Sequence, residues 1–86
     1  MSAEIEYPVQ YTFKVMGRQE DDFSAHVRVL FARLLGIDLE PGAVRELESR
    51  RGTYVSVSVT VKLDSESQRR SIYAELHADP KVVYYL

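Results

Sequence analysis

Two histidines are the first residues of this chain whose type could support chemistry. His26 and His77 are predicted on two different helices, and neither has an acidic partner at ligand spacing. The chain has no cysteine that could complete a metal site. We therefore predict that both histidines are solvated surface residues, with His77 favoured by a helix C-terminus. The protein is expected to bind no metal and no other cofactor.

Nucleophilic and phosphate chemistry is equally poorly supported. The serines of the segment 53–63 (T-Y-V-S-V-S-V-T-V-K-L) are spread evenly along a strand, without a base beside any one of them. Gly17 and Arg18 precede a helix and could form an anion site, but the acidic run 20–22 would repel an anion there. The chain also lacks the asparagine that acyl-phosphate hydrolysis needs. We predict that the protein is not an enzyme.

Length and charge narrow the class of protein further. The 86 residues suffice for one domain, which we place at 7–86 behind a flexible tail at 1–6. The net charge is -2, from 11 basic and 13 acidic side chains, which argues against a dedicated nucleic-acid binder. No apolar run approaches the roughly 20 residues that span a bilayer, and the N-terminus lacks the features of a signal peptide. We expect a cytoplasmic protein without membrane contact.

The hydrophobic periodicity predicts six elements in the order β-α-β-β-α-β. Period-two alternation indicates strands, and apolar residues at steps of three and four indicate helices. Asp21 or Asp22 is the expected N-cap of the first helix, and Ser65 with Gln68 fits a capping box for the second. Gly17 is expected to end the first strand in a tight turn. The predicted strands are 7–16, 43–49, 53–63 and 81–86, with helices over 23–35 and from about 66 to 79.

This order of elements favours the ferredoxin-like βαββαβ split sandwich, an α+β fold. Right-handed crossovers and hairpin pairing give a four-stranded antiparallel sheet of order 4-1-3-2, with both helices on one face. The valines of 53–63 must then face the helices. The serines and threonines of the same strand lie on the helix-free side of the sheet, called the open face below.

RNA recognition by this fold uses aromatic side chains on the open face of the two central strands. The corresponding positions hold hydroxyls and one lysine: Thr12, Lys14, Ser56, Ser58 and Thr60. Only Tyr54, near the start of its strand, could stack on a base. We therefore predict no nucleic-acid binding.

Four segments together resemble a known family: Y-T-F-K-V-M-G at 11–17, R-G-T-Y-V-S-V-S-V-T-V at 51–61, I-Y-A-E-L at 72–76 and the terminal V-V-Y-Y-L. They are similar to the YbeD-like family of small bacterial proteins of unknown function. The resemblance implies a ferredoxin-like fold close to that of ACT regulatory domains, and a regulatory role. By the ACT analogy an effector would bind near the turn after the first strand, here Gly17 and Arg18.

Two functions stay open at this point. The first is a non-catalytic regulatory or protein-interaction module that binds an unidentified partner through the open face, with Tyr84 or Tyr85 joining it according to register. The alternative is an ACT-like sensor of a small molecule, an amino acid or a lipoate-related compound. A homodimer is compatible with both, because the last strand is an expected sheet edge. The candidate binding residues are Lys14, Gly17, Arg18, Tyr54, Ser56, Ser58 and Thr60.

Overall fold

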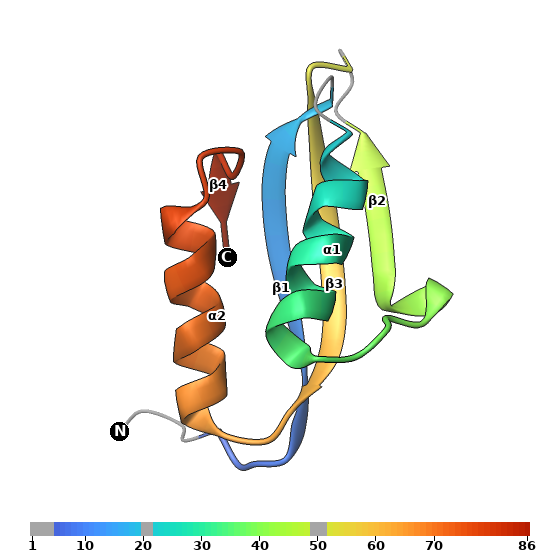
Figure 1. Cartoon of the computed structure of the whole chain (residues 1–86). Coiled ribbons are helices and arrows are strands. Elements are labelled where there is room, and N and C mark those ends of the chain that lie inside the picture. The colour runs from blue at the N-terminus through green and yellow to red at the C-terminus, as the bar shows by residue number, and fades with distance from the viewer. Residues whose placement is uncertain (1–4, 20–21, 49–51) are drawn as a thin grey trace.

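The computed structural model describes residues 5–19, 22–48 and 52–86, and its elements follow the predicted order. Both helices lie on the same side of one sheet (Figure 1). The elements are β1 (Val9–Arg18), α1 (Phe23–Leu35), the short 3₁₀ helix η2 (Pro41–Ala43), β2 (Val44–Glu48), β3 (Tyr54–Leu63), α2 (Glu66–Ala78) and β4 (Tyr84–Tyr85).

The strand order is β2-β3-β1-β4, and every neighbouring pair is antiparallel. This is the predicted order of 4-1-3-2 counted from the other edge, so the ferredoxin-like fold is confirmed. The two central strands pair over their full length, from Val9 opposite Leu63 to Arg18 opposite Tyr54. The two edge strands are much shorter than the central pair.

The hydrophobic core lies between the helices and one face of the sheet. Every second side chain of β3 is buried, as the alternation of valines predicted. Phe13 of β1 occupies the centre, with its ring 5.3 Å from Phe31 and 5.0 Å from Tyr73 between centroids. The buried set is Phe13, Val15, Phe23, Val27, Leu30, Phe31, Val55, Val57, Val59, Val61, Leu63, Ile72 and Leu76.

The helix ends agree only partly with their predicted caps. Ser65 accepts a hydrogen bond from the Gln68 amide at 3.1 Å, while the Gln68 side chain accepts one from the Asp64 amide instead of closing the capping box on Ser65. Asp22 occupies the N-cap position of α1 in a left-handed conformation, with no side-chain capping bond. The alternative cap, Asp21, lies outside the described residues.

The first and last strands differ from their predicted bounds. β1 continues through Gly17, which pairs with Val55, so the prediction that Gly17 ends the strand in a turn is wrong. The last strand is shorter than predicted, because residues 80–81 form a turn after α2 and regular pairing begins only at Tyr84. Of the predicted tail, residues 1–4 lie outside the described residues. So do Arg50 and Arg51, which the sequence predicts in a hairpin turn between the second and third strands.

Candidate functional site

The open face brings together most of the residues that the sequence proposed for binding. Lys14 lies opposite Ser58, and Thr60 lies opposite Thr12, with their hydroxyl oxygens 2.8 Å apart. Antiparallel neighbours directly opposite each other share one face, so these side chains form a contiguous surface. Ser56 lies between them and Tyr54, which is opposite Arg18 at the end of the central pair.

A row of apolar side chains crosses this face perpendicular to the strands. Leu47 of β2 lies opposite Ser56, Ser56 lies opposite Met16 of β1, and Met16 lies opposite Tyr84 of β4. Leu47 is 73% exposed and Tyr84 is 56% exposed. We call Leu47, Met16 and Tyr84 the apolar row. The register thereby places Tyr84 on the open face and Tyr85 against the helices.

A second row runs beside the apolar row and carries positive charge. Ser58 lies between Arg45 of β2 and Lys14 of β1. Lys14 in turn exchanges two backbone hydrogen bonds with Leu86, at 3.2 and 2.8 Å, so the exposed Leu86 side chain joins the same face. We call Arg45 and Lys14 the cationic row.

The open face is therefore basic, although the whole chain is acidic. Among the described strand residues that point to this side, none is acidic. The cations there are Lys14, Arg18, Arg45 and Lys62. The 13 acidic side chains of the chain belong to the rest of the molecule or to residues outside the description. A basic surface of this kind attracts an acidic partner and repels a second copy of itself.

Gly17, which the ACT analogy proposed as part of an effector site, lies on the opposite side of the sheet from the open face. It is buried on the helix side of β1, and a Cβ atom built there would lie 2.3 Å from Cδ1 of Phe23. Glycine is required at position 17 because the Phe23 ring packs directly on the backbone there. A left-handed backbone is not the reason, since the φ angle of Gly17 lies outside that region. Gly17 and Arg18 therefore form the end of a strand, without the turn on which the ACT analogy placed an effector.

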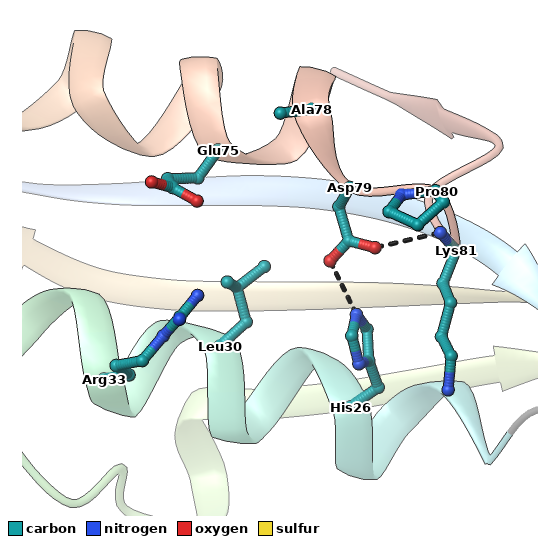
Figure 2. Close-up of a pocket in the computed structure, with 8 residues that line it drawn as sticks. All are labelled: His26, Leu30, Arg33, Glu75, Ala78, Asp79, Pro80 and Lys81. Carbon is teal, nitrogen blue, oxygen red and sulfur yellow. Dashed lines mark hydrogen bonds and ion pairs between the residues drawn. The ribbon is translucent and has the colours of Figure 1, made fainter.

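The groove between the two helices contains a histidine–aspartate pair, His26 and Asp79, that sequence reasoning missed. His26 Nε2 lies 2.6 Å from Asp79 Oδ2, and the Asp79 side chain is only 10% exposed (Figure 2). The prediction of a solvated His26 without an acidic partner is therefore wrong. The pair joins the first turn of α1 to the residue after α2, 53 positions away. No periodic signal in the sequence could have indicated this contact.

The pair borders a cleft of about 280 Å³. Arg33 and Glu75 approach the cleft from opposite helices, and the Lys81 side chain runs along its other end (Figure 2). Both positive and negative side chains line it. The groups therefore compensate one another, and the cleft presents no net preference for one ligand charge. The His26–Asp79 pair links the two helices. It does not form part of a nucleophilic triad, since no described serine or threonine side chain hydrogen-bonds to His26.

A third polar cluster lies where the start of β1 meets the start of α2. Arg69 donates two hydrogen bonds to Glu66, each at 3.0 Å, and Tyr7 donates a third at 2.6 Å. The bond from Arg69 is the main reason that the pKa of Glu66 falls from 4.5 to about 2. Burial, with the hydrogen bond between the Tyr73 and Tyr11 hydroxyls, raises the pKa of Tyr73 to about 12. The positive charge of Arg69 is already compensated by the Glu66 carboxylate. We therefore interpret the cluster as structural.

Within residues 5–19, 22–48 and 52–86, no group of three or more His, Cys, Asp or Glu side chains could hold a metal ion. The other predicted surface histidine, His77, is exposed and lies 3.2 Å from the Tyr85 hydroxyl. In the same part of the chain, neither helix has the length and apolar character needed to cross a membrane.

The fold and the open face define a small ferredoxin-like α+β protein with one sheet surface left uncovered by helices. Residues 2–86 match the model of the family described as "Protein of unknown function (DUF493)", and the chain belongs to that family. The resemblance to YbeD-like proteins drawn from the sequence is confirmed by this match.

Curated relatives carry the same designation of unknown function. A UPF0250 protein of Nitrosomonas europaea is 30% identical over 82 residues, covering 95% of this chain and 93% of the relative. A UPF0250 protein of Bordetella pertussis is 35% identical over 80 residues, covering 91% and 85%. Protein HP0495 from H. pylori, solved in solution, superposes with a TM-score of 0.72 at 20% identity, covering 99% of this chain and 88% of that chain. This last likeness supports the fold alone.

Proposed function

We propose that the protein is a non-catalytic interaction module that binds a protein partner through the open face of its sheet. The observation that carries this proposal is the apolar row, in which Leu47 of β2, Met16 of β1 and Tyr84 of β4 lie in line across the sheet, with the small Ser56 of β3 between Leu47 and Met16. Large apolar side chains grouped on one surface gain free energy only when another surface covers them. A regulatory role, exerted through that partner in the cytoplasm, is part of the proposal.

The described residues form no catalytic arrangement, and this supports the same interpretation. The hydroxyls of the open face pair with one another, as Thr12 does with Thr60, and no described histidine or carboxylate reaches them. A serine nucleophile needs a base within hydrogen-bond distance, and the one close His–Asp pair among the described residues lies on the helix side of the sheet.

Site-specific photo-crosslinking tests the proposal. A photoreactive phenylalanine analogue at position 47 is expected to give discrete covalent protein adducts in the cell that makes the protein. The same analogue at position 29 is the matched control, because Val29 is 67% exposed but lies on α1. Adducts at position 47 alone support the proposal. Equal adducts at both positions, or none at position 47, would contradict it.

The alternative of an ACT-like sensor has less support. Its effector site was predicted at a turn formed by Gly17 and Arg18, and both residues lie in β1. A thermal-shift screen with amino acids, lipoate and nucleotides addresses it, because a ligand at 100 times its dissociation constant adds about 2.7 kcal/mol to the free energy of unfolding. A clear shift with one compound would replace the interaction module by a sensor.

A further inference from the structure

We infer that the partner of the open face is an acidic amphipathic helix that lies across the strands, with its apolar side on Leu47, Met16 and Tyr84 and its carboxylates on the cationic row. This inference rests on the proposed function and specifies the chemistry of the partner. Three features of the open face support it: the length of the apolar row, the charge beside that row, and the occupants that the charge disfavours.

The length of the apolar row matches a short helix. Strands in a sheet lie about 4.8 Å apart, so the row from β2 to β4 spans about 14 Å. A helix rises 1.5 Å per residue, and about ten residues cover that distance in three turns. Apolar side chains at positions i, i+4 and i+7 of such a helix can contact the three members of the row. The small Ser56 between Leu47 and Met16 leaves room for one of them.

The charge beside the row selects an acidic helix. Arg45 and Lys14 lie two residues along their strands from Leu47 and Met16, which is about 7 Å at the usual rise per residue. Carboxylates that flank the apolar stripe of a helix would meet these cations. Both side chains are exposed, and none of the described hydrogen bonds or ion pairs of the chain engages them. They can therefore pair without breaking an existing contact.

The same charge disfavours the other occupants of a sheet face. A second copy of this chain, packed face to face, would bring Lys14 and Arg45 against their own counterparts without an acid between them. A single-stranded nucleic acid would find cations, but the central strands offer hydroxyls where stacking rings are needed, and Leu47 has no role against phosphates. An acidic amphipathic helix covers the apolar row with its apolar side and pairs its carboxylates with the cationic row.

A charge series of peptides on the unmodified protein tests the inference without relying on any variant. Three 14-residue helical peptides carry leucine at i, i+4, i+7 and i+11 and differ only in their flanks, which are Glu, Gln or Lys. In NMR titrations we expect the Glu peptide to shift the amide signals of β2, β3 and β1 around the apolar row. The Gln peptide should bind about tenfold more weakly, and the Lys peptide should give no shifts.

Two variants locate the contact. Combining Lys14→Glu with Arg45→Glu is expected to lower the affinity for the Glu peptide at least tenfold and to let the Lys peptide bind. The control Arg33→Glu reverses a single charge on the exposed surface of α1 and should leave the binding of both peptides unaffected. All three positions are exposed, and an unchanged amide spectrum elsewhere verifies that each variant is folded.

Several outcomes would overturn the inference. These are equal binding of the Glu and Lys peptides, shifts confined to the helices, no shifts with the Glu peptide at 1 mM, or tighter binding of a ten-residue oligouridylate than of the Glu peptide. The crosslinking experiment at position 47 distinguishes failure of the acidic-helix inference from failure of the proposed interaction function. Protein adducts at position 47 together with a preference for the Lys peptide would preserve an interaction module and reject the acidic helix.

Discussion

The two faces of β3 are built from alternate residues of one strand, and they obey different physical constraints. On the helix side, Val55, Val57 and Val59 are buried and belong to the core that both helices cover. On the open side, Ser56 and Ser58 are half-buried between larger side chains of the neighbouring strands. The helix side is specified by volume, because a gap or an overlap there destabilises the fold. The open side is specified by polarity and charge, and the fold tolerates changes there.

The largest contrast is expected for a large-to-small change at the centre of the core. Phe13→Ala should lower the free energy of unfolding by about 3–5 kcal/mol, because the Phe13 ring is fully buried among three aromatic neighbours. A domain of this size has only about 4–13 kcal/mol in total. Urea denaturation measures the loss. Leu47→Ala is the matched control on the open face and should change stability by at most about 0.5 kcal/mol. A comparable loss in both variants would refute the contrast.

A smaller effect is expected where the backbone itself is packed. Gly17→Ala should destabilise by about 1–3 kcal/mol, since the added Cβ overlaps the Phe23 ring. The double variant Gly17→Ala, Phe23→Leu should lose less free energy of unfolding than the two single variants lose in sum. The reason is that the smaller side chain at position 23 leaves room for the added methyl group. Gly42→Ala is the control, because a Cβ atom at that position would meet nothing within 4 Å. Strict additivity would show that Phe23 is not the obstacle.

The contribution of Glu66, at the start of α2, to the free energy of unfolding should depend on pH. The folded state lowers the pKa of Glu66 from 4.5 to about 2, so the stability contributed by this carboxylate is complete above about pH 4.5. It is lost as the pH falls from there towards 2. Urea midpoints measured between pH 5 and pH 2.5 should therefore fall less steeply for Glu66→Gln than for the unmodified protein. Glu75→Gln removes an exposed carboxylate from the same helix and should leave the slope nearly unchanged.

The smallest effect is expected on the open face. Thr60→Val removes the hydroxyl contact with Thr12 but keeps a β-branched side chain. We expect a change of at most about 0.5 kcal/mol in the free energy of unfolding, because the Thr12 hydroxyl is exposed and can bond to water. A loss above about 1.5 kcal/mol would show that this face is needed for folding, and it would weaken the case for an interaction surface.

The strongly periodic segments could be predicted from the sequence, whereas the edges of the sheet could not. β3 and α1 each have an unambiguous buried side, which determines their structure and their place in the fold. β2 is different, because Val44 and Leu47 lie on opposite faces of the same short strand and either phase was compatible with the sequence. Pairing of Val44 with Val59 selects one phase and exposes Leu47, so this member of the apolar row was missed.

The sequence by itself determined the order of elements, the ferredoxin-like topology and the small, mildly polar character of the open face, because these depend on patterns between residues close in the chain. The tertiary structure alone decided that Gly17 supports the Phe23 ring, that His26 binds Asp79, and that the open face combines an apolar row with a cationic row. Each of these depends on residues brought together from different elements. Such contacts are set by packing and register, which no local pattern encodes.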